Sequence, residues 1–167
     1  MTTRITVQRG DITGSTADVL VNATTAALLG NALLEAAGPG VVKEIQRIRE
    51  SNLTDGLPAG GAVATNAGNL PAKWIVHTVA PSWDAEEDRS ELLASCYVQA
   101  IELADKLGAL SIVFPAIGLA EGWSADDAAR IASDAIASTD THLESATFVI
   151  DDDAVELAFG STVTAPN

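Results

Sequence analysis

Three short segments rich in polar or glycine residues each follow an apolar stretch of the sequence. Gly10 and Asp11 come after "RITVQ", residues 22–30 come after "DVLV", and residues 118–123 come after "SIVFPAI". If the apolar stretches are strands of one parallel sheet, these segments meet outside its carboxyl edge, where open α/β sheets bind ligands. Backbone N–H groups in such turns can close around a phosphate. We therefore expect the three segments to share one crevice.

Other side chains with chemical potential are better explained by structural roles. His77 in "WIVHTV" and His142 in a polar turn are too few for a histidine metal site, and we expect no metal and no cofactor. Cys96 lies beside the apolar face of an expected helix, where a buried thiol is inert. Ser124 is placed to cap a helix, and the acidic run 151–153 is typical of a solvated helix start.

Strand and helix patterns alternate along the chain. This alternation predicts a largely parallel sheet covered by helices on both faces, with the first strand at an edge, where it could run antiparallel. The expected strands are 4–8, 18–23, 61–65, 73–80, 110–117 and 145–150, and the expected helices are 31–37, 40–50, 90–107, 124–138 and a short last one within 151–160. No repeat or linker interrupts the pattern, so we expect a single domain over residues 1–167.

The composition excludes several functional classes. The chain has 167 residues, 47% of them hydrophobic, and a net charge of −14. This charge repels nucleic acid and anionic lipid, so binding to a nucleic-acid backbone is not expected. No apolar run approaches the roughly 20 residues of a membrane span, and the first residues lack the apolar block of a secretory signal. We expect a cytoplasmic protein without membrane contact that works as a monomer.

The order and spacing of several motifs resemble those of macro domains. The motifs are "RGDIT", "ADVLVNAT", "LLG", "AAGP", "NLPAKWIVHTVAP", "CY..AIELA..LG" and "SIVFPAI", and the resemblance runs from about Arg4 to Phe159. It implies a three-layer α/β/α fold, with a mixed, mostly parallel sheet of about six strands, and a cleft for ADP-ribose. It also implies that Asp11 accepts a hydrogen bond from the adenine amino group and that Ile12 flanks the base. From the residues alone, an Asx turn that leaves the strand is the favoured explanation of Asp11.

The first ligand loop departs from the family pattern. Macro-domain enzymes commonly carry "VNAAN", whose last residue holds the distal ribose, whereas this chain has "VNATT" with Thr25 there. Asn22 is retained, and we expect it to hold the strand end. The glycine-rich segment and its acid are missing, which leaves Gly30 as the glycine of the loop. Glu35 is the nearest carboxylate, expected on a solvated helix face, and Asn31 is expected to cap that helix.

The second loop and the adenine end also differ. Gly118 and Gly122 keep a permissive backbone, and Trp123 could cover the ribose or the diphosphate. Glu121 would repel a diphosphate if it faced one, and we expect it to face solvent. Ile150 and Val155 stand where the family commonly has a stacking aromatic, so the base would lose a stack worth roughly 1–3 kcal/mol.

Three functions follow from the resemblance. The leading hypothesis is a module that binds ADP-ribose or a related adenine nucleotide, free or protein-attached, with little hydrolase activity. The second is an ADP-ribosyl hydrolase or O-acetyl-ADP-ribose deacetylase with an altered mechanism, and the third is a degenerate interaction scaffold. No catalytic residue is assigned. The residues expected at the ligand site are Asp11, Ile12, Asn22, Thr25, Gly30, Gly118, Leu119, Ala120, Glu121, Gly122, Trp123 and Ile150.

Overall fold

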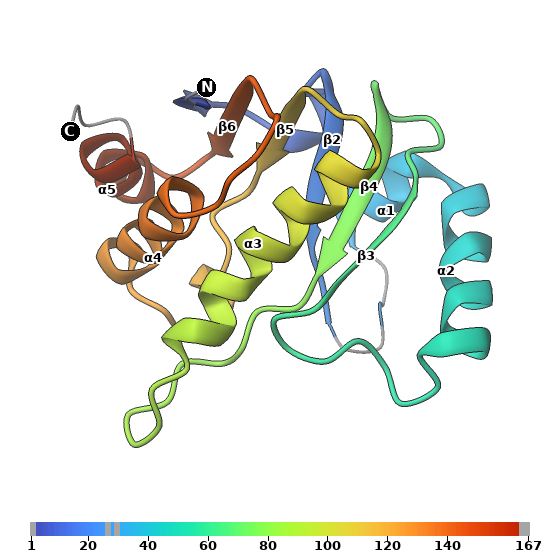
Figure 1. Ribbon diagram of the computed structural model, residues 1–167, viewed down its shortest axis with the longest axis horizontal. Helices are drawn as coiled ribbons and strands as arrows, with labels where there is room; N and C mark the ends of the chain where they lie inside the picture. The colour runs from blue at the N-terminus through green and yellow to red at the C-terminus, as the bar shows by residue number, and fades with distance from the viewer. Residues whose placement is uncertain (1–2, 26–27, 29–30, 164–167) are drawn as a thin grey trace.

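A six-stranded sheet forms the centre of the protein (Figure 1). The computed structural model describes residues 3–25, 28 and 31–163. The strand order is β1-β6-β5-β2-β4-β3; β3 is antiparallel to β4, and the other neighbouring pairs are parallel. The strands are β1 (Arg4–Arg9), β2 (Ala17–Ala23), β3 (Ala62–Asn66), β4 (Ala72–Thr78), β5 (Ser111–Phe114) and β6 (Ser145–Ile150).

Strand β1 lies at an edge, as expected, but it runs parallel to its neighbour. The possibility of an antiparallel first strand is therefore wrong. The partner of β1 is β6, the last strand of the chain, and a connection of this length can return the chain in either direction. The register pairs Arg9 with Ile150, so both strands end at the same level of the sheet. The segments that follow β1 and β6 consequently leave the sheet side by side.

Helices cover both faces of the sheet, which confirms the three-layer α/β/α fold. In Figure 1, α3, α4 and α5 lie on one side of the sheet and α1 and α2 on the other. Each side has its own buried apolar cluster. The helices are α1 (Ala32–Ala37), α2 (Pro39–Asn52), α3 (Ser90–Lys106), α4 (Ala125–Ala137) and α5 (Asp153–Val163), with short 3-10 turns η1 (Ile12–Gly14) and η2 (Leu119–Glu121).

Aromatic packing anchors the larger core near the carboxyl ends of the strands. Tyr97 of α3 packs against Phe114 of β5 with ring centroids 5.1 Å apart, and Phe148 of β6 packs against Phe114 at 5.5 Å. The Tyr97 hydroxyl also accepts a hydrogen bond from the backbone N–H of Ile117 at 3.3 Å. Because these side chains are fully buried, the segment that leaves β5 is held to the core from its first residues.

Two helix starts confirm the capping pattern of the sequence. Ser124 accepts a hydrogen bond from the Asp127 N–H at 3.1 Å at the start of α4. Asn31 accepts one from the Leu34 N–H at 3.0 Å at the start of α1. Side-chain caps of this kind fix where the helix begins and therefore where the preceding loop ends.

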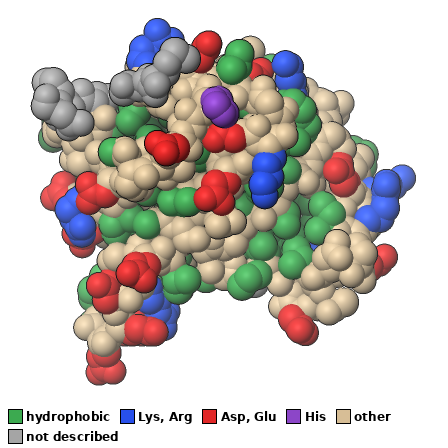
Figure 2. All heavy atoms as spheres, viewed as in Figure 1, with side chains coloured by type: hydrophobic (Ala, Val, Ile, Leu, Met, Phe, Trp, Pro, Cys, Tyr) green, Lys and Arg blue, Asp and Glu red, His purple; other side chains and the backbone are tan. Residues whose placement is uncertain are grey.

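Acidic side chains spread over the face shown in Figure 2 and gather on the loop that projects between β4 and α3. That loop carries Asp84, Glu86, Glu87 and Asp88, and Arg89 at its base pairs with Asp84 and Glu87. A field of this sign opposes the long-range approach of an anionic ligand. Within the described residues, no helix is long and apolar enough to cross a membrane.

Candidate functional site

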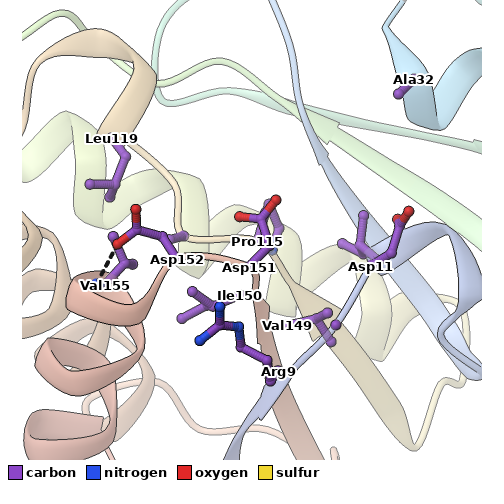
Figure 3. Close-up of a pocket in the computed structure, with 13 residues that line it drawn as sticks. Arg9, Asp11, Ala32, Pro115, Leu119, Val149, Ile150, Asp151, Asp152 and Val155 are labelled. Carbon is purple, nitrogen blue, oxygen red and sulfur yellow. Dashed lines mark hydrogen bonds between the residues drawn. The ribbon is translucent and has the colours of Figure 1, made fainter.

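A cleft of about 740 Å³ opens at the carboxyl edge of the sheet, where β1, β5 and β6 end. Residues from four separate segments of the sequence meet there (Figure 3). The lining residues are Arg9, Gly10, Asp11, Ile12, Ala32, Pro115, Ala116, Leu119, Val149, Ile150, Asp151, Asp152 and Val155. The segments after β1 and β5 thus share a crevice, as the sequence predicts.

Asp11 stands at the rim of this cleft and also caps the turn η1. Its Oδ1 accepts hydrogen bonds from the backbone N–H of Thr13 at 2.9 Å and from the Thr13 hydroxyl at 2.8 Å. These bonds, the backbone one first, lower the pKa of the Asp11 carboxyl, which is therefore ionised at neutral pH. Oδ2 accepts no hydrogen bond from any residue that the structure describes, so an exposed carboxylate oxygen remains for a ligand donor.

The floor of the cleft beside Asp11 is apolar. Ile12 is half-buried in η1, Ile150 is buried at the end of β6, and Val155 lies in the first turn of α5. All three line the cleft, and its described lining contains no aromatic side chain. A planar base could pack on this floor by dispersion and apolar contact, without a ring to stack on.

Arg9 brings a positive charge to the same end of the cleft. Its guanidinium bonds the Asp153 carboxylate, and this contact raises the pKa of Arg9. The Asp152 carboxylate accepts a hydrogen bond from the Val155 N–H at 3.1 Å and caps the first turn of α5, as the dashed line in Figure 3 shows. Arg9 was not predicted from the sequence. It lies two residues before Asp11, but only the pairing of β1 with β6 brings it beside Ile150 at the cleft.

A smaller recess of about 260 Å³ adjoins the cleft, between the end of β2 and the start of α1. It shares Ile12, Ala32 and Pro115 with the cleft and adds Val21, Asn22, Ala23, Asn31 and Leu33. Asn22 is buried at the end of β2, where its side chain bonds both His77 and Asn31. Its expected role in holding the strand end fits these contacts.

The remaining expected residues of the first loop are only partly placed. Thr25 is exposed, and its carbonyl accepts a hydrogen bond from the Leu28 N–H at 2.8 Å. Gly30 lies outside the described residues. Glu35 is exposed on α1, on a solvated helix face as expected.

The second loop contributes one side chain to the cleft lining, that of Leu119. Gly118 and Gly122 have left-handed backbone conformations, with φ of 103° and 97°. Ala120 is exposed on the 3-10 turn between them. A side chain at Gly118 would also meet the Trp123 ring at 3.1 Å, so the loop needs glycine there for two reasons.

Trp123 does not lie where a ligand cover is expected. The ring is buried, with 6% of the residue exposed, and its Nε1 donates a hydrogen bond to the Pro81 carbonyl at 2.9 Å. An apolar ring with a satisfied N–H is more stable in the core than at the surface. The interpretation that Trp123 covers a ribose or diphosphate therefore does not fit this placement; the ring supports the loop from beneath.

Glu121 is also placed differently from the expectation. It is half-buried rather than fully solvated, and burial raises the pKa of its carboxyl. Its charge in turn helps to raise the pKa of Cys96, after the larger effect of burial on that thiol. Cys96 is fully buried and donates from Sγ to the Val79 carbonyl at 3.3 Å, which fits an inert core thiol.

Comparison with known proteins decides the family. The family model described as "Macro domain" matches residues 21–132. A macro domain-containing protein of Streptomyces coelicolor is 46% identical over 165 residues, which cover 95% of this chain and 98% of the relative. The chain belongs to the macro domain family.

Two further similarities concern macro domains with named ligands or activities. An O-acetyl-ADP-ribose deacetylase of Citrobacter koseri is 42% identical over 144 residues, covering 82% of this chain and 80% of that protein. A solved structure of the Oceanobacillus iheyensis macrodomain with ADP superimposes with a TM-score of 0.88 at 32% identity, covering 94% of this chain and 88% of that one. The similarity to both extends over most of the fold that builds the cleft.

Proposed function

We propose that this macro domain binds ADP-ribose or a closely related adenine nucleotide, free or attached to a protein, and has little hydrolase activity. The observation that carries the proposal is the Asp11 carboxylate, ionised and with one oxygen open, above an apolar floor at the end of the cleft. The relatives support it, since one is named for O-acetyl-ADP-ribose and another was solved with ADP.

The chemistry of Asp11 selects adenine. An ionised carboxylate only accepts hydrogen bonds, and the adenine 6-amino group only donates. Guanine presents a carbonyl oxygen at the same position, which would face the carboxylate with like partial charge. Ile12, Ile150 and Val155 would contact the two faces and edges of the base.

The electrostatics of the cleft predict weak binding. The net charge of −14 opposes an anionic ligand, and the Arg9 guanidinium in the lining is engaged by Asp153. The missing aromatic stack costs roughly 1–3 kcal/mol, or about ten- to hundredfold in affinity. We expect a dissociation constant in the tens of micromolar or worse, since ~10 μM corresponds to roughly −7 kcal/mol.

The carboxylates near the cleft do not form an evident hydrolytic site. A general base must reach its proton at about 2.6–3.2 Å, directly or through one water. Asp11 is assigned to adenine, and Asp151 and Asp152 line the cleft beside Ile150, where Asp152 caps α5. Glu35 is exposed on α1 outside the lining of the cleft and of the recess. Thr25 replaces the amide that commonly holds the distal ribose in this family. These features support a binding module rather than an efficient enzyme.

Hydrolysis is the second candidate, and one observation favours it. Glu121 is half-buried on the second loop, outside the lining of the cleft and of the recess, and burial raises the pKa of its carboxyl, which suits a general acid or base better than an exposed carboxylate. Removal of ADP-ribose from a modified protein and deacetylation of O-acetyl-ADP-ribose should both be assayed with the wild type, Glu121→Gln and Glu35→Gln. We expect no turnover above background. Robust turnover that Glu121→Gln abolishes and Glu35→Gln spares would establish an enzyme and name its base.

The test of the binding proposal is base selectivity. Calorimetric titration with ADP and GDP at low salt compares two ligands with the same diphosphate and different bases. We expect ADP to bind at least tenfold more tightly, because a hydrogen bond to a charged group contributes about 1.5–3 kcal/mol. Equal affinities would contradict adenine readout by Asp11. We propose in addition that the protein acts as a cytoplasmic monomer. We also propose that it avoids nucleic-acid backbones, which its net charge of −14 would repel.

A further inference from the structure

A continuous series of side-chain hydrogen bonds crosses the sheet from the first loop to the edge strand β3. We call this series the relay. It passes through β2 and β4, and its central members are fully or almost fully buried. In order from α1 to β3 its members are Leu34, Asn31, Asn22, His77, Thr65 and Asn66.

Both ends of the relay have a fixed hydrogen-bonding role. At the α1 end the donor is the backbone N–H of Leu34, which bonds Asn31 Oδ1 at 3.0 Å. At the β3 end the acceptor is the backbone carbonyl of Asn66, which receives the Thr65 hydroxyl at 2.9 Å. A backbone N–H can only donate and a carbonyl can only accept, so these two groups determine the direction of every bond between them.

The orientations of the two amide groups in the relay follow from the hydrogen bond at its Leu34 end. Because Asn31 Oδ1 is the acceptor there, its Nδ2 is the atom that donates to Asn22 Oδ1 at 2.7 Å. Asn22 Nδ2 then donates to His77 Nδ1 at 3.0 Å. His77 Nδ1 must therefore be unprotonated.

The hydrogen bonds of His77 and Thr65 are consistent with these amide orientations. A neutral imidazole with a bare Nδ1 carries its proton on Nε2, which donates to Thr65 Oγ1 at 2.9 Å. Thr65 is then free to donate its own proton to the Asn66 carbonyl. Burial, which strongly favours the neutral form of His77, acts in the same sense. Every member thus has one assigned orientation.

This orientation has a consequence for the recess between the end of β2 and the start of α1. Both Asn22 and Asn31 line the recess, and Asn31 is half-buried. The Asn31 Nδ2 carries two hydrogens and donates one of them to Asn22 Oδ1. Among the residues that the structure describes, none accepts the second hydrogen. A flip of the amide would break two bonds at once, so the nitrogen stays on the recess side.

We propose that Asn31 is a specificity-determining residue that donates a hydrogen bond to the part of the ligand beyond its first phosphate, and that His77 and Thr65 are positioning residues which hold its amide in that orientation. The inference rests on the proposed function, because the ligand is the adenine nucleotide whose base lies near Asp11. The recess shares Ile12, Ala32 and Pro115 with the cleft, and its lining does not include Ile150 or Val155, so we assign to it the second phosphate or the distal ribose. Both offer oxygen acceptors to an amide N–H.

Asn31→Ser tests the donor while keeping the helix cap, since serine and asparagine cap helices about equally well. Wild type and variant are titrated with AMP and with ADP-ribose by calorimetry. We expect Asn31→Ser to weaken ADP-ribose about tenfold and AMP less than about twofold, the effect of losing one hydrogen bond to a polar or charged acceptor. Asn52→Ser, at the exposed end of α2, is the matched control and should change neither affinity. Equal changes for the two ligands, or no change, would overturn the assignment.

Thr65 tests the positioning role because it lies outside both lining sets. Thr65→Val removes the acceptor of the His77 Nε2 proton, and Thr65→Ser restores it. We expect Thr65→Val to reduce the preference for ADP-ribose over AMP and Thr65→Ser to retain it. If both variants lost the preference for ADP-ribose, or if both kept it, the relay would be contradicted.

Nitrogen-15 spectra of the histidine rings provide a readout that does not depend on any ligand. The chain has two histidines, so a His142→Gln variant assigns the His77 signals. We expect His77 to show a bare Nδ1 and a protonated Nε2, and the opposite tautomer would overturn the relay. If the wild type bound neither AMP nor ADP-ribose, the proposed function and the ligand role of Asn31 would fail together. Wild-type binding that Asn31→Ser leaves unchanged would refute the inference alone.

Discussion

Trp123 Nε1 donates a hydrogen bond to the Pro81 carbonyl at 2.9 Å and so ties the second loop to the segment that leaves β4. The loop is fastened again from the β5 side, where the Ile117 N–H bonds the Tyr97 hydroxyl. The Trp83 N–H also donates to the Glu121 carbonyl at 2.9 Å. These three hydrogen bonds therefore hold the backbone of the second loop against the segment that leaves β4 and against α3.

Trp123→Phe should lower stability more than it changes ligand affinity. The substitution keeps most of the apolar ring but leaves the buried Pro81 carbonyl without its donor, which costs about 1–3 kcal/mol of unfolding free energy. Urea unfolding measures this loss, and AMP affinity is measured beside it. Trp83→Phe is the control, because Trp83 is 50% exposed and should change stability by less than about 0.5 kcal/mol. A large loss of AMP affinity at unchanged stability would make Trp123 a ligand contact.

Gly118→Ala should destabilise the second loop. Its φ of 103° disfavours any residue with a Cβ, and that Cβ would meet the Trp123 ring at 3.1 Å and Leu93 at 3.2 Å. We expect a loss of about 1–3 kcal/mol in urea unfolding. Gly40→Ala in α2 is the matched control: nothing lies within 4 Å of its added Cβ, and it should be neutral or stabilising. Equal stability of the two variants would show that the loop conformation is not constrained as described.

Asp11→Ser should weaken adenine nucleotides without weakening ribose 5-phosphate. Serine can still accept the Thr13 N–H, so the η1 turn keeps its cap while the open carboxylate oxygen is removed. Calorimetry with AMP and ribose 5-phosphate separates base recognition from phosphate recognition. Asp55→Ser removes a charge at an exposed position and controls for the change in net charge. A matching loss for both ligands would assign Asp11 a structural role.

The stability of the protein should fall in mildly acidic solution because of His77. Burial lowers the pKa of its imidazole from 6.5 to about 4, so the unfolded chain takes up a proton at a higher pH than the folded protein does. The stabilisation is complete above pH 6.5 and is lost as the pH falls toward 4. At about 1.4 kcal/mol for each pKa unit, the loss reaches about 3 kcal/mol.

Urea unfolding of the wild type and His77→Gln at several pH values isolates this contribution. The carboxylates titrate in both proteins, so the difference between their unfolding free energies reports the contribution of His77. We expect the wild type to lose stability faster than the variant below pH 6.5. A difference that is constant from pH 7.5 to pH 4.5 would show that His77 is not buried in its neutral form.

The sequence predicted the layers and most elements of the fold because periodicity is a local property. The helix caps at Asn31 and Ser124 were also readable, since a side chain and a backbone N–H three residues apart define them. The direction of β1 was open because it depends on pairing with β6, some 140 residues later. Arg9 was not predicted for the same reason, because the pairing of β1 with β6 brings it to the cleft.

The second loop shows where pattern alone was insufficient. Its glycines were recognised, but the burial of Trp123 depends on the Pro81 carbonyl, 42 residues earlier in the chain. Glu121 likewise lies close enough to α3 for its charge to contribute to the raised pKa of Cys96. Both placements result from packing between distant segments, and neither has a signature in the loop itself.

Calorimetric titration with ADP-ribose at low salt tests the central claim most directly. The net charge of −14, a described cleft lining without an aromatic ring and the pairing of Arg9 with Asp153 predict weak binding. We expect a dissociation constant in the tens of micromolar or worse, about −7 kcal/mol or weaker. Asp11→Ser, run beside the wild type, should weaken that binding further. Absence of any heat of binding at millimolar ligand would contradict the proposed function, and a submicromolar dissociation constant would contradict the physical account of the altered loops.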